Sequence, residues 1–196
     1  MAHVMSFEVG VSGESPSRKL EKVGDLVEIA GSQRPLTAVM AGGERVEDLL
    51  LVESARDHGI IDRIVLVGRE QRIIDSVAKV GIEVPREDII AADGDEEAAA
   101  ATVALVKAGG VEMILKGSTP TQVINRHMLP LATRATVSLV SIFDAAPISN
   151  GRPMILTDAG ITTVCSFGRV AGLIRNAVDV ARSVMLIDRP RVAILS

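Results

Sequence analysis

Short apolar runs alternate with longer amphipathic stretches along this chain, and glycine stands at most of the junctions. The first run is Leu36–Met40, which Ala41–Gly43 connects to Arg45–His58, a stretch with apolar residues at helical spacing. Gly59 follows, as is typical of the position just after a helix. A buried strand, a helix and a second buried strand form a βαβ unit, so the pattern predicts an α/β fold with a mostly parallel sheet.

The alternation continues along the rest of the chain and indicates three regions. Further strands or apolar runs lie at Ile64–Val67, Asp88–Ala91, Val111–Leu115, Val137–Phe143, Met154–Thr157 and Val192–Leu195. Helices are predicted at Glu70–Val80, at Glu96–Lys107, from Pro120 onward and at Phe167–Met185. We expect a polar N-terminal extension at 1–33, a first α/β domain at 34–135 and the start of a second, incomplete α/β domain at 136–196.

Side chains that suit helix N-caps mark where several of these helices begin. Asp93 or Asp95 is expected to cap the alanine-rich helix that precedes Gly109. Thr119 is expected to cap the next helix, with Pro120 as its first residue. Ser166 is the expected N-cap of the last helix.

Composition excludes several classes of protein. A hydrophobic content of 47% argues against a disordered chain, and no apolar stretch approaches the roughly 20 residues that a membrane span needs. Three Phe with no Trp or Tyr, and a net charge of −4, argue against a nucleic-acid-binding surface. A single cysteine, Cys165, excludes a disulfide framework and a zinc site built on paired cysteines. Without an apolar signal segment near the N-terminus, we expect a cytoplasmic protein.

The segment from Lys116 to Thr121 is the best candidate for a binding site. It follows a predicted strand and opens a helix, whose first amide N–H groups favour anions. Its candidate anion-binding residues provide a positive charge, close backbone approach and two hydroxyl groups: Lys116, Gly117, Ser118 and Thr121. Arg126 lies about two turns along the same helix and is expected to reach back towards this loop. The alternative is a well-capped loop with a surface lysine.

Other candidate residues leave alternatives open. Asp158 ends a predicted strand and is either a carboxylate at the ligand-binding edge of the sheet or an N-cap of the next turn. Gly42 and Gly43 do not complete a dinucleotide-binding motif and are better explained by a tight turn. Cys165 lacks an evident base and is expected to be a small, buried or partly buried side chain. The histidines lack metal-ligand spacing, so no metal site is expected.

Several segments together resemble the phosphate acetyl- and butyryltransferase family. The segments that carry the likeness are Met113–Gly117 with Thr121 and Arg126, then Val137–Phe143, Ile155–Ile161, Arg175–Arg182 and Arg189–Ser196. They occur in the family's order and spacing, and the resemblance runs from Arg34 to Ser196. Each motif alone is weakly specific, whereas the set is quite specific.

The resemblance implies reversible acyl transfer, in which acyl-CoA and phosphate give acyl phosphate and CoA. It also implies a three-layer α/β/α fold of the isocitrate and isopropylmalate dehydrogenase type, in a homodimer with the active site between domains. Coenzyme A would be a substrate rather than a bound cofactor, and no covalent enzyme intermediate is expected. In this interpretation Lys116, Gly117, Ser118, Thr121 and Arg126 position anions, and Asp158 is the catalytic carboxylate.

The chain also departs from the family pattern. Thr162–Cys165 replaces a family Asn-Ile-Ala-Pro run, and Leu139 stands where the family often has His. The principal catalytic serine, arginine and aspartate of the family lie in a continuation beyond the segment that ends at Ser196. A second hypothesis is therefore a non-catalytic module that binds CoA or phosphate. A third, a nicotinamide-dependent dehydrogenase, would need an aspartate cluster and a nucleotide loop that the sequence does not show.

Overall fold

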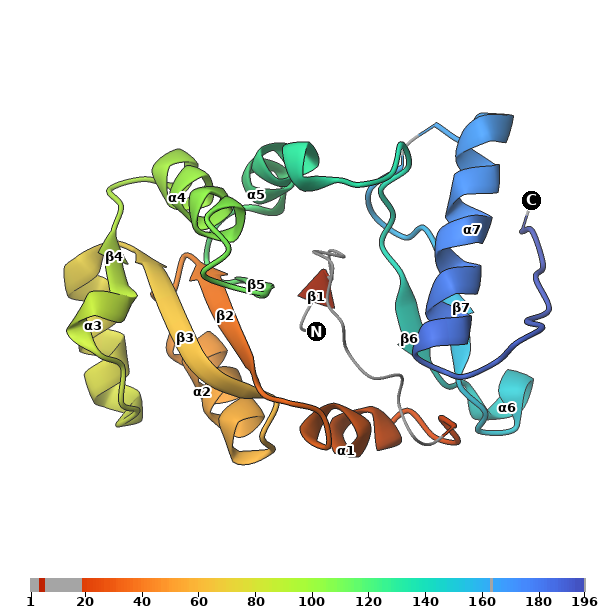
Figure 1. Cartoon of the computed structure of the whole chain (residues 1–196), viewed down its shortest axis with the longest axis horizontal. Helices are drawn as coiled ribbons and strands as arrows, with labels where there is room; N and C mark the ends of the chain where they lie inside the picture. The colour runs from red at the N-terminus through yellow and green to blue at the C-terminus, as the bar shows by residue number, and fades with distance from the viewer. Residues whose placement is uncertain (1–3, 6–18, 163, 196) are drawn as a thin grey trace. The chain divides into compact units, whose positions relative to one another are not determined.

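The computed structural model describes residues 4–5, 19–162 and 164–195, which form two compact units (Figure 1). Unit 1 comprises Arg34–Thr133 together with Met1–Val11, and unit 2 comprises Arg134–Ser196 together with Ser12–Gln33. The described helices of four or more residues are α1 (Asp25–Gly31), α2 (Val46–Asp57), α3 (Glu70–Val80), α4 (Asp95–Lys107), α5 (Thr121–Met128), α6 (Ala146–Ser149) and α7 (Phe167–Ser183). The described strands are β1 (Val4–Met5), β2 (Leu36–Ala41), β3 (Ile61–Gly68), β4 (Ile89–Ala91), β5 (Met113–Lys116), β6 (Ser141–Phe143) and β7 (Met154–Leu156). Whether the expected boundaries at 33/34 and 135/136 separate folding domains stays a prediction.

Unit 1 contains a five-stranded sheet in the order β1-β5-β2-β3-β4. Strands β5, β2, β3 and β4 are parallel, and β1 pairs with β5 in the antiparallel direction. The prediction of an α/β fold with a mostly parallel sheet is therefore confirmed for this unit. The chain builds outward from β2 to β4 and then returns to place β5 on the other side of β2.

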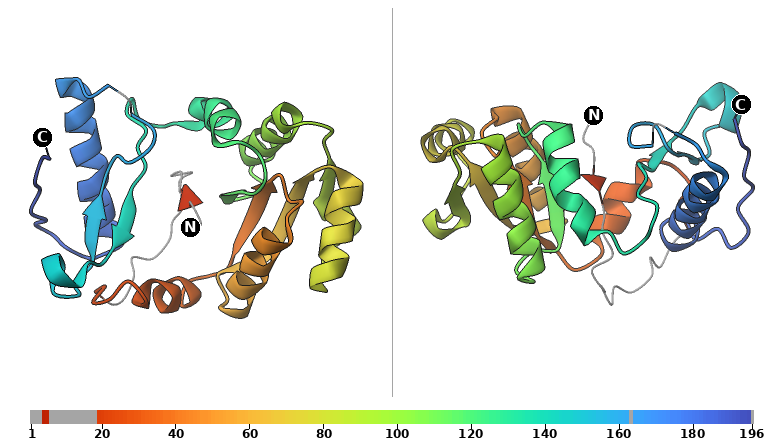
Figure 2. Two further views of the ribbon diagram at one scale, coloured as in Figure 1. Left: turned by 180° about the vertical axis from the view of Figure 1, so that it is seen from behind. Right: turned by 90° about the horizontal axis from the view of Figure 1, so that it is seen from above.

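Helices cover both faces of this sheet, which gives three layers (Figure 2). Alternate residues of β2 point to opposite faces: Val39 and Ala41 pack with α4 and α5, whereas Ala38 and Met40 pack with α2 and α3. The residues of β3 alternate in the same way. Strands buried on both faces need apolar side chains at every position, which explains their continuous apolar runs.

Helix starts in unit 1 differ from the predicted caps. Helix α4 has Gly94 as its N-cap and α5 has Pro120, in both cases without a side-chain cap bond, so the Asp93, Asp95 and Thr119 predictions were wrong. Proline lacks an N–H group but tolerates this position because its φ angle suits the start of a helix. In unit 2 the predicted cap is confirmed, because the Ser166 hydroxyl accepts a hydrogen bond from the Arg169 N–H.

Unit 2 contains an antiparallel pair, β6 and β7, and the long helix α7. The pair is antiparallel because the segment joining the two strands is shorter than the dozen or so residues of a parallel crossover. The Asn176 amide donates hydrogen bonds to Thr136 O (3.0 Å) and Ser138 Oγ (2.9 Å), which holds α7 to the chain before β6. The strand predicted at Val192–Leu195 is not formed, and these residues are exposed.

No described helix is both long enough and apolar enough to cross a lipid bilayer.

Candidate functional site

The order of the strands places the candidate loop at the point where the direction of sheet growth reverses. Strands β2 and β5 are neighbours, and Ala41 pairs with Lys116 at their carboxyl ends. In open parallel α/β sheets, ligands bind beyond the carboxyl ends of the strands where the strand order reverses. The loop after β2, which contains Gly42 and Gly43, and the loop from Gly117 to Pro120 after β5 both lie there.

These two loops contact each other through their backbones. The Gly117 N–H donates to Ala41 O (2.9 Å) and the Ser118 N–H donates to Gly42 O (2.8 Å). A Cβ at Gly117 would overlap the Gly42 carbonyl, and a Cβ at Gly42, which has φ +77°, would lie 2.5 Å from Ser118 Oγ. Glycine is required at both positions because one backbone approaches the other. The space beside Gly117 is thus filled by Gly42.

The remaining groups of the loop differ in exposure. Lys116 is half-buried, and its Nζ donates to the carbonyl oxygen of Gly117 (3.1 Å). Ser118 is half-buried, whereas Thr121 is exposed at the first residue of α5. Thr119 is fully buried, and its Oγ1 has no hydrogen-bond partner within the described part of the chain. The sequence marked Thr119 only as an N-cap, so this unpaired buried hydroxyl was missed.

The structure places Arg126 against α4 rather than back over the loop. Its guanidinium donates to Glu96, the second residue of α4, and Glu96 also contacts Nε2 of His127 (2.8 Å). Hydrogen bonds from Arg126 first, and from His127 second, lower the pKa of Glu96. Both members of the Arg126–Glu96 pair are about two-thirds exposed, at 65% and 62%.

Asp158 lies in unit 2, where backbone groups surround its carboxylate. Oδ1 accepts hydrogen bonds from the N–H groups of Leu139 (3.0 Å), Gly160 (3.2 Å) and Ile161 (3.2 Å), and Oδ2 accepts one from Thr162 (2.6 Å). Burial alone would raise the pKa of Asp158, but these backbone donors together lower it. A carboxylate held in this way is ionised at neutral pH and is a weak proton acceptor.

Replacing Asp158 with Asn is expected to destabilise unit 2 at neutral pH, by about 1 kcal/mol, because an amide cannot accept from all four donors. A group whose pKa is lowered on folding stabilises the protein above its ordinary pKa of 3.8 and loses that effect as pH falls through the folded value. The difference between wild type and Asp158→Asn should therefore be large at pH 7 and shrink at pH 3. Urea unfolding at both pH values measures it.

Asp144→Asn, at an exposed position in the same unit, is the matched control for that comparison. We expect it to change the urea midpoint little at either pH. An equal difference between wild type and Asp158→Asn at pH 7 and pH 3 would contradict the expectation.

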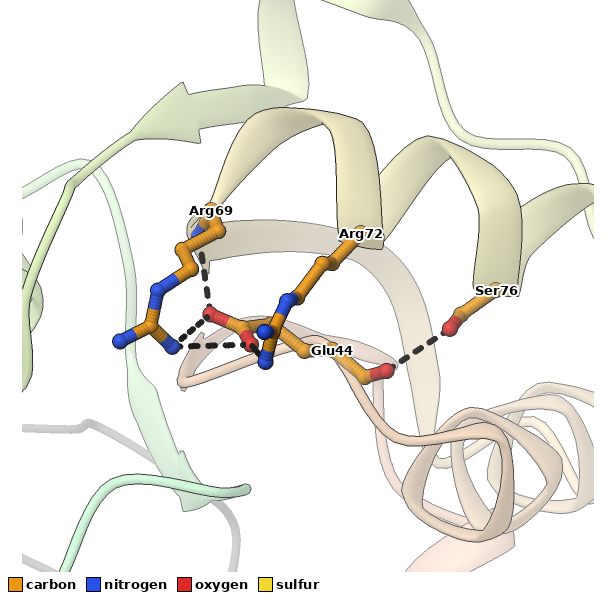
Figure 3. A network of polar contacts seen from close by, with 4 residues as sticks. All are labelled: Glu44, Arg69, Arg72 and Ser76. Carbon is orange, nitrogen blue, oxygen red and sulfur yellow. Dashed lines mark hydrogen bonds and ion pairs between the residues drawn. The ribbon is translucent and has the colours of Figure 1, made fainter.

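A network around Glu44 lies at the same edge of the sheet and was not found from the sequence (Figure 3). The Glu44 side chain is only 10% exposed, and it accepts a hydrogen bond from the Arg69 N–H (2.9 Å) and ion pairs from the Arg69 and Arg72 guanidinium groups. The Ser76 hydroxyl donates to the Glu44 carbonyl oxygen (2.7 Å). Residues 69, 72 and 76 share one face of α3, which is the signal in the sequence that could have found them.

Two further expectations concern cysteine and metal chemistry. Cys165 is exposed, so the expected buried or partly buried side chain was wrong. In the described residues, no three His, Cys, Asp or Glu side chains gather as metal ligands would.

Comparison with known proteins gives relatives of one kind. No family model matches the chain. A phosphate butyryltransferase from Clostridium acetobutylicum is 31% identical over 146 residues, which is 72% of this chain. One from Clostridium beijerinckii is 33% identical over 137 residues, and a phosphate acetyltransferase from Rhizobium meliloti is 27% identical over 175 residues. This chain is a homologue of the phosphate butyryl- and acetyltransferases.

Solved phosphotransacylase structures share the fold. A phosphotransacetylase from Streptococcus pyogenes superposes with a TM-score of 0.66 over 85% of this chain at 14% identity. A branched-chain phosphotransacylase from Enterococcus faecalis V583 superposes with a TM-score of 0.50 at 19% identity. The chain spans about half the length of the curated relatives it matches, with 47%, 44% and 54% of the three sequences covered.

Proposed function

We propose that this chain takes part in phosphate acyltransfer, converting acyl-CoA and phosphate to acyl phosphate and CoA, with an acetyl or butyryl group. The observation that carries the proposal is the set of relatives with those names, aligned over most of this chain. A phosphate oxygen attacks the thioester carbonyl carbon, so a C–O bond forms as the C–S bond breaks. CoA leaves as a thiolate that takes up a proton, and no covalent enzyme intermediate is needed.

The loop after β5 is the proposed anion-binding site. Lys116 supplies a positive charge beside the loop, and the first amide N–H groups of α5 have no partner within the helix. The hydroxyl groups of Ser118 and Thr121 are further donors, and the buried Thr119 hydroxyl is a donor still without an acceptor. Gly117 contributes by letting the two loops meet. Such a site positions an anion and stabilises negative charge that develops on the acyl carbonyl oxygen.

Arg126 is the proposed second contact for an anion. Its pair with Glu96 is exposed on both sides, and exposed ion pairs contribute little stability. A phosphate group that offers two oxygens to the guanidinium can therefore replace Glu96 at low cost. Asp158 is proposed as the carboxylate of the acyltransfer site, acting through the backbone of residues 158–162 that it holds, because its lowered pKa makes it a weak base.

The proposed form of the enzyme is a cytoplasmic homodimer with an α/β/α fold of the isocitrate and isopropylmalate dehydrogenase type. The alternative function is a module that binds CoA or phosphate without turnover. The observation that favours the alternative is length, because the chain spans about half of its curated relatives.

Lys116→Ala and Arg126→Ala are each expected to weaken CoA or phosphate binding about tenfold, because each removes a charge-assisted hydrogen bond to the anion. Isothermal titration with CoA and with inorganic phosphate measures the affinity, and thiol release from acetyl-CoA and butyryl-CoA in phosphate buffer measures turnover. Lys107→Ala, on an exposed residue in the last turn of α4, is the control for Lys116→Ala. Arg86→Ala is the control for Arg126→Ala, because Arg86 also forms an exposed pair with a glutamate, Glu70.

Phosphate-dependent thiol release that falls in both site variants would support the enzyme. Saturable binding without thiol release would support the non-catalytic module instead. Absence of both, or equal losses in the site and control variants, would refute this assignment of the loop.

A further inference from the structure

Glu44 is the most buried charged side chain of the network in Figure 3, and it lies between two elements of unit 1. It follows the turn after β2, and its carboxylate binds the first residues of α3. A Cβ at Gly68, the last residue of β3, would lie 3.1 Å from Glu44 Oε1, so the carboxylate occupies the space above Gly68. One side chain thus joins the loop after β2 to the loop after β3.

The partners of Glu44 differ in exposure. The Arg69 and Arg72 side chains are 44% and 67% exposed, so water solvates much of each guanidinium. The bond from the Arg69 N–H is a backbone contact whose donor position is fixed by the start of α3. That bond, with the Ser76 bond to the Glu44 carbonyl, gives the turn a defined position.

A short chain of backbone bonds runs from Glu44 to the loop after β5. The N–H groups of Gly42 and Gly43 both donate to Val67 O, at 2.8 and 3.2 Å. The carbonyl of Gly42 then accepts from the Ser118 N–H at 2.8 Å. A displacement of the turn at residues 42–44 therefore moves Ser118, because their backbones are in direct contact.

We propose that Glu44 is a positioning residue for the anion-binding loop, which it holds through the backbone of Gly42. The inference rests on the proposed function, in which the loop from Lys116 to Thr121 binds phosphate or CoA. Glutamine at position 44 has the same shape but turns an N–H₂ group towards donors that the carboxylate accepts from. The turn would then lose its attachment to α3, and the donors around Ser118 would lose their fixed spacing.

Glu44→Gln is expected to weaken binding of inorganic phosphate or CoA to the 196-residue chain on the order of tenfold, because small displacements of a preorganised site are costly. It is also expected to shift the backbone amide signals of Ser118 and Thr119 in ¹⁵N NMR spectra recorded without ligand. A purely structural role would lower stability but leave the affinity of the folded protein and these two signals unchanged.

Asp88→Asn is the matched control, because Asp88 is also a buried carboxylate bound to an arginine, and it lies at the amino end of β4 rather than at the loop. It should lower stability without changing phosphate affinity or the Ser118 signal. Arg69→Ala is the second variant and the readout if Glu44→Gln does not fold. It keeps the backbone bond to Glu44 and should change affinity and signals in the same direction but less.

The outcomes separate the two proposals. Wild-type protein that binds neither phosphate nor CoA would refute the proposed function, while the NMR comparison would still test the coupling of Glu44 to Ser118. Wild-type binding with unchanged affinity in Glu44→Gln, or with unshifted Ser118 and Thr119 signals, would overturn the positioning role alone. Equal loss of affinity in Asp88→Asn would overturn it as well.

Discussion

Gly117→Ala is expected to lower the free energy of unfolding of unit 1 by about 3 kcal/mol, the upper end of the usual cost of overpacking. The added Cβ would overlap the Gly42 carbonyl oxygen and lie 2.8 Å from its carbon and 3.1 Å from Ala41 O. All three contacts are backbone atoms, so no rotation of a side chain relieves them. The two loops would have to separate, which breaks the bond from the Gly117 N–H to Ala41 O.

Urea unfolding followed by circular dichroism measures that loss. Gly110→Ala is the control in the same unit, since a Cβ there would meet only Leu105 O at 4.0 Å. We expect the control to change the urea midpoint little. If Gly117→Ala and Gly110→Ala unfold at the same urea concentration, the close approach of the two loops is wrong.

Arg63→Ala is expected to lower the urea midpoint by about 1 M, because it leaves the Asp88 carboxylate buried without its partner. Arg63 Nε donates to both Asp88 oxygens, at 3.0 and 3.1 Å, and its other nitrogen donates to Oδ1 at 2.6 Å. The Asp88 side chain is 3% exposed, whereas that of Arg63 is 54% exposed. Water can solvate Arg63 after its partner is lost but cannot reach Asp88.

The effect is therefore expected to be asymmetric. Asp88→Asn should lower the midpoint clearly less than Arg63→Ala, because it removes the buried charge itself. Urea titrations of both variants at pH 7 test this order. The reverse order would mean that the exposed guanidinium, rather than the buried carboxylate, determines the stability of this pair.

Local periodicity accounts for what could be predicted from the sequence. The predicted helix Glu70–Val80 has the observed bounds of α3, because its apolar spacing and the glycine that follows are both local signals. The same is true of β2 and of the Ser166 cap. Apolar runs without alternation predicted strands buried on both faces, and the two clusters that cover the sheet agree with that.

Contacts between distant residues account for what could not. The pairing of Arg126 with Glu96 joins positions 30 apart, and the Glu44 network joins positions 25 and 32 apart. No local pattern marks such partners. The glycines were recognised as turn residues, but that Gly117 faces Gly42 follows only from the neighbouring positions of β2 and β5 in the sheet.

The neighbouring positions of β2 and β5 also determine when the site can form during folding. The strands around β2 are close in sequence, whereas Thr37 and Glu112, which bond where β2 meets β5, are separated by 75 residues. Contacts of such long sequence separation cost the most loop entropy and tend to form late. The two glycine loops meet only after β5 has joined the sheet. A chain that lacks this last strand pairing has no anion-binding loop, however much of its helix content has formed, so ligand binding reports completed folding of unit 1.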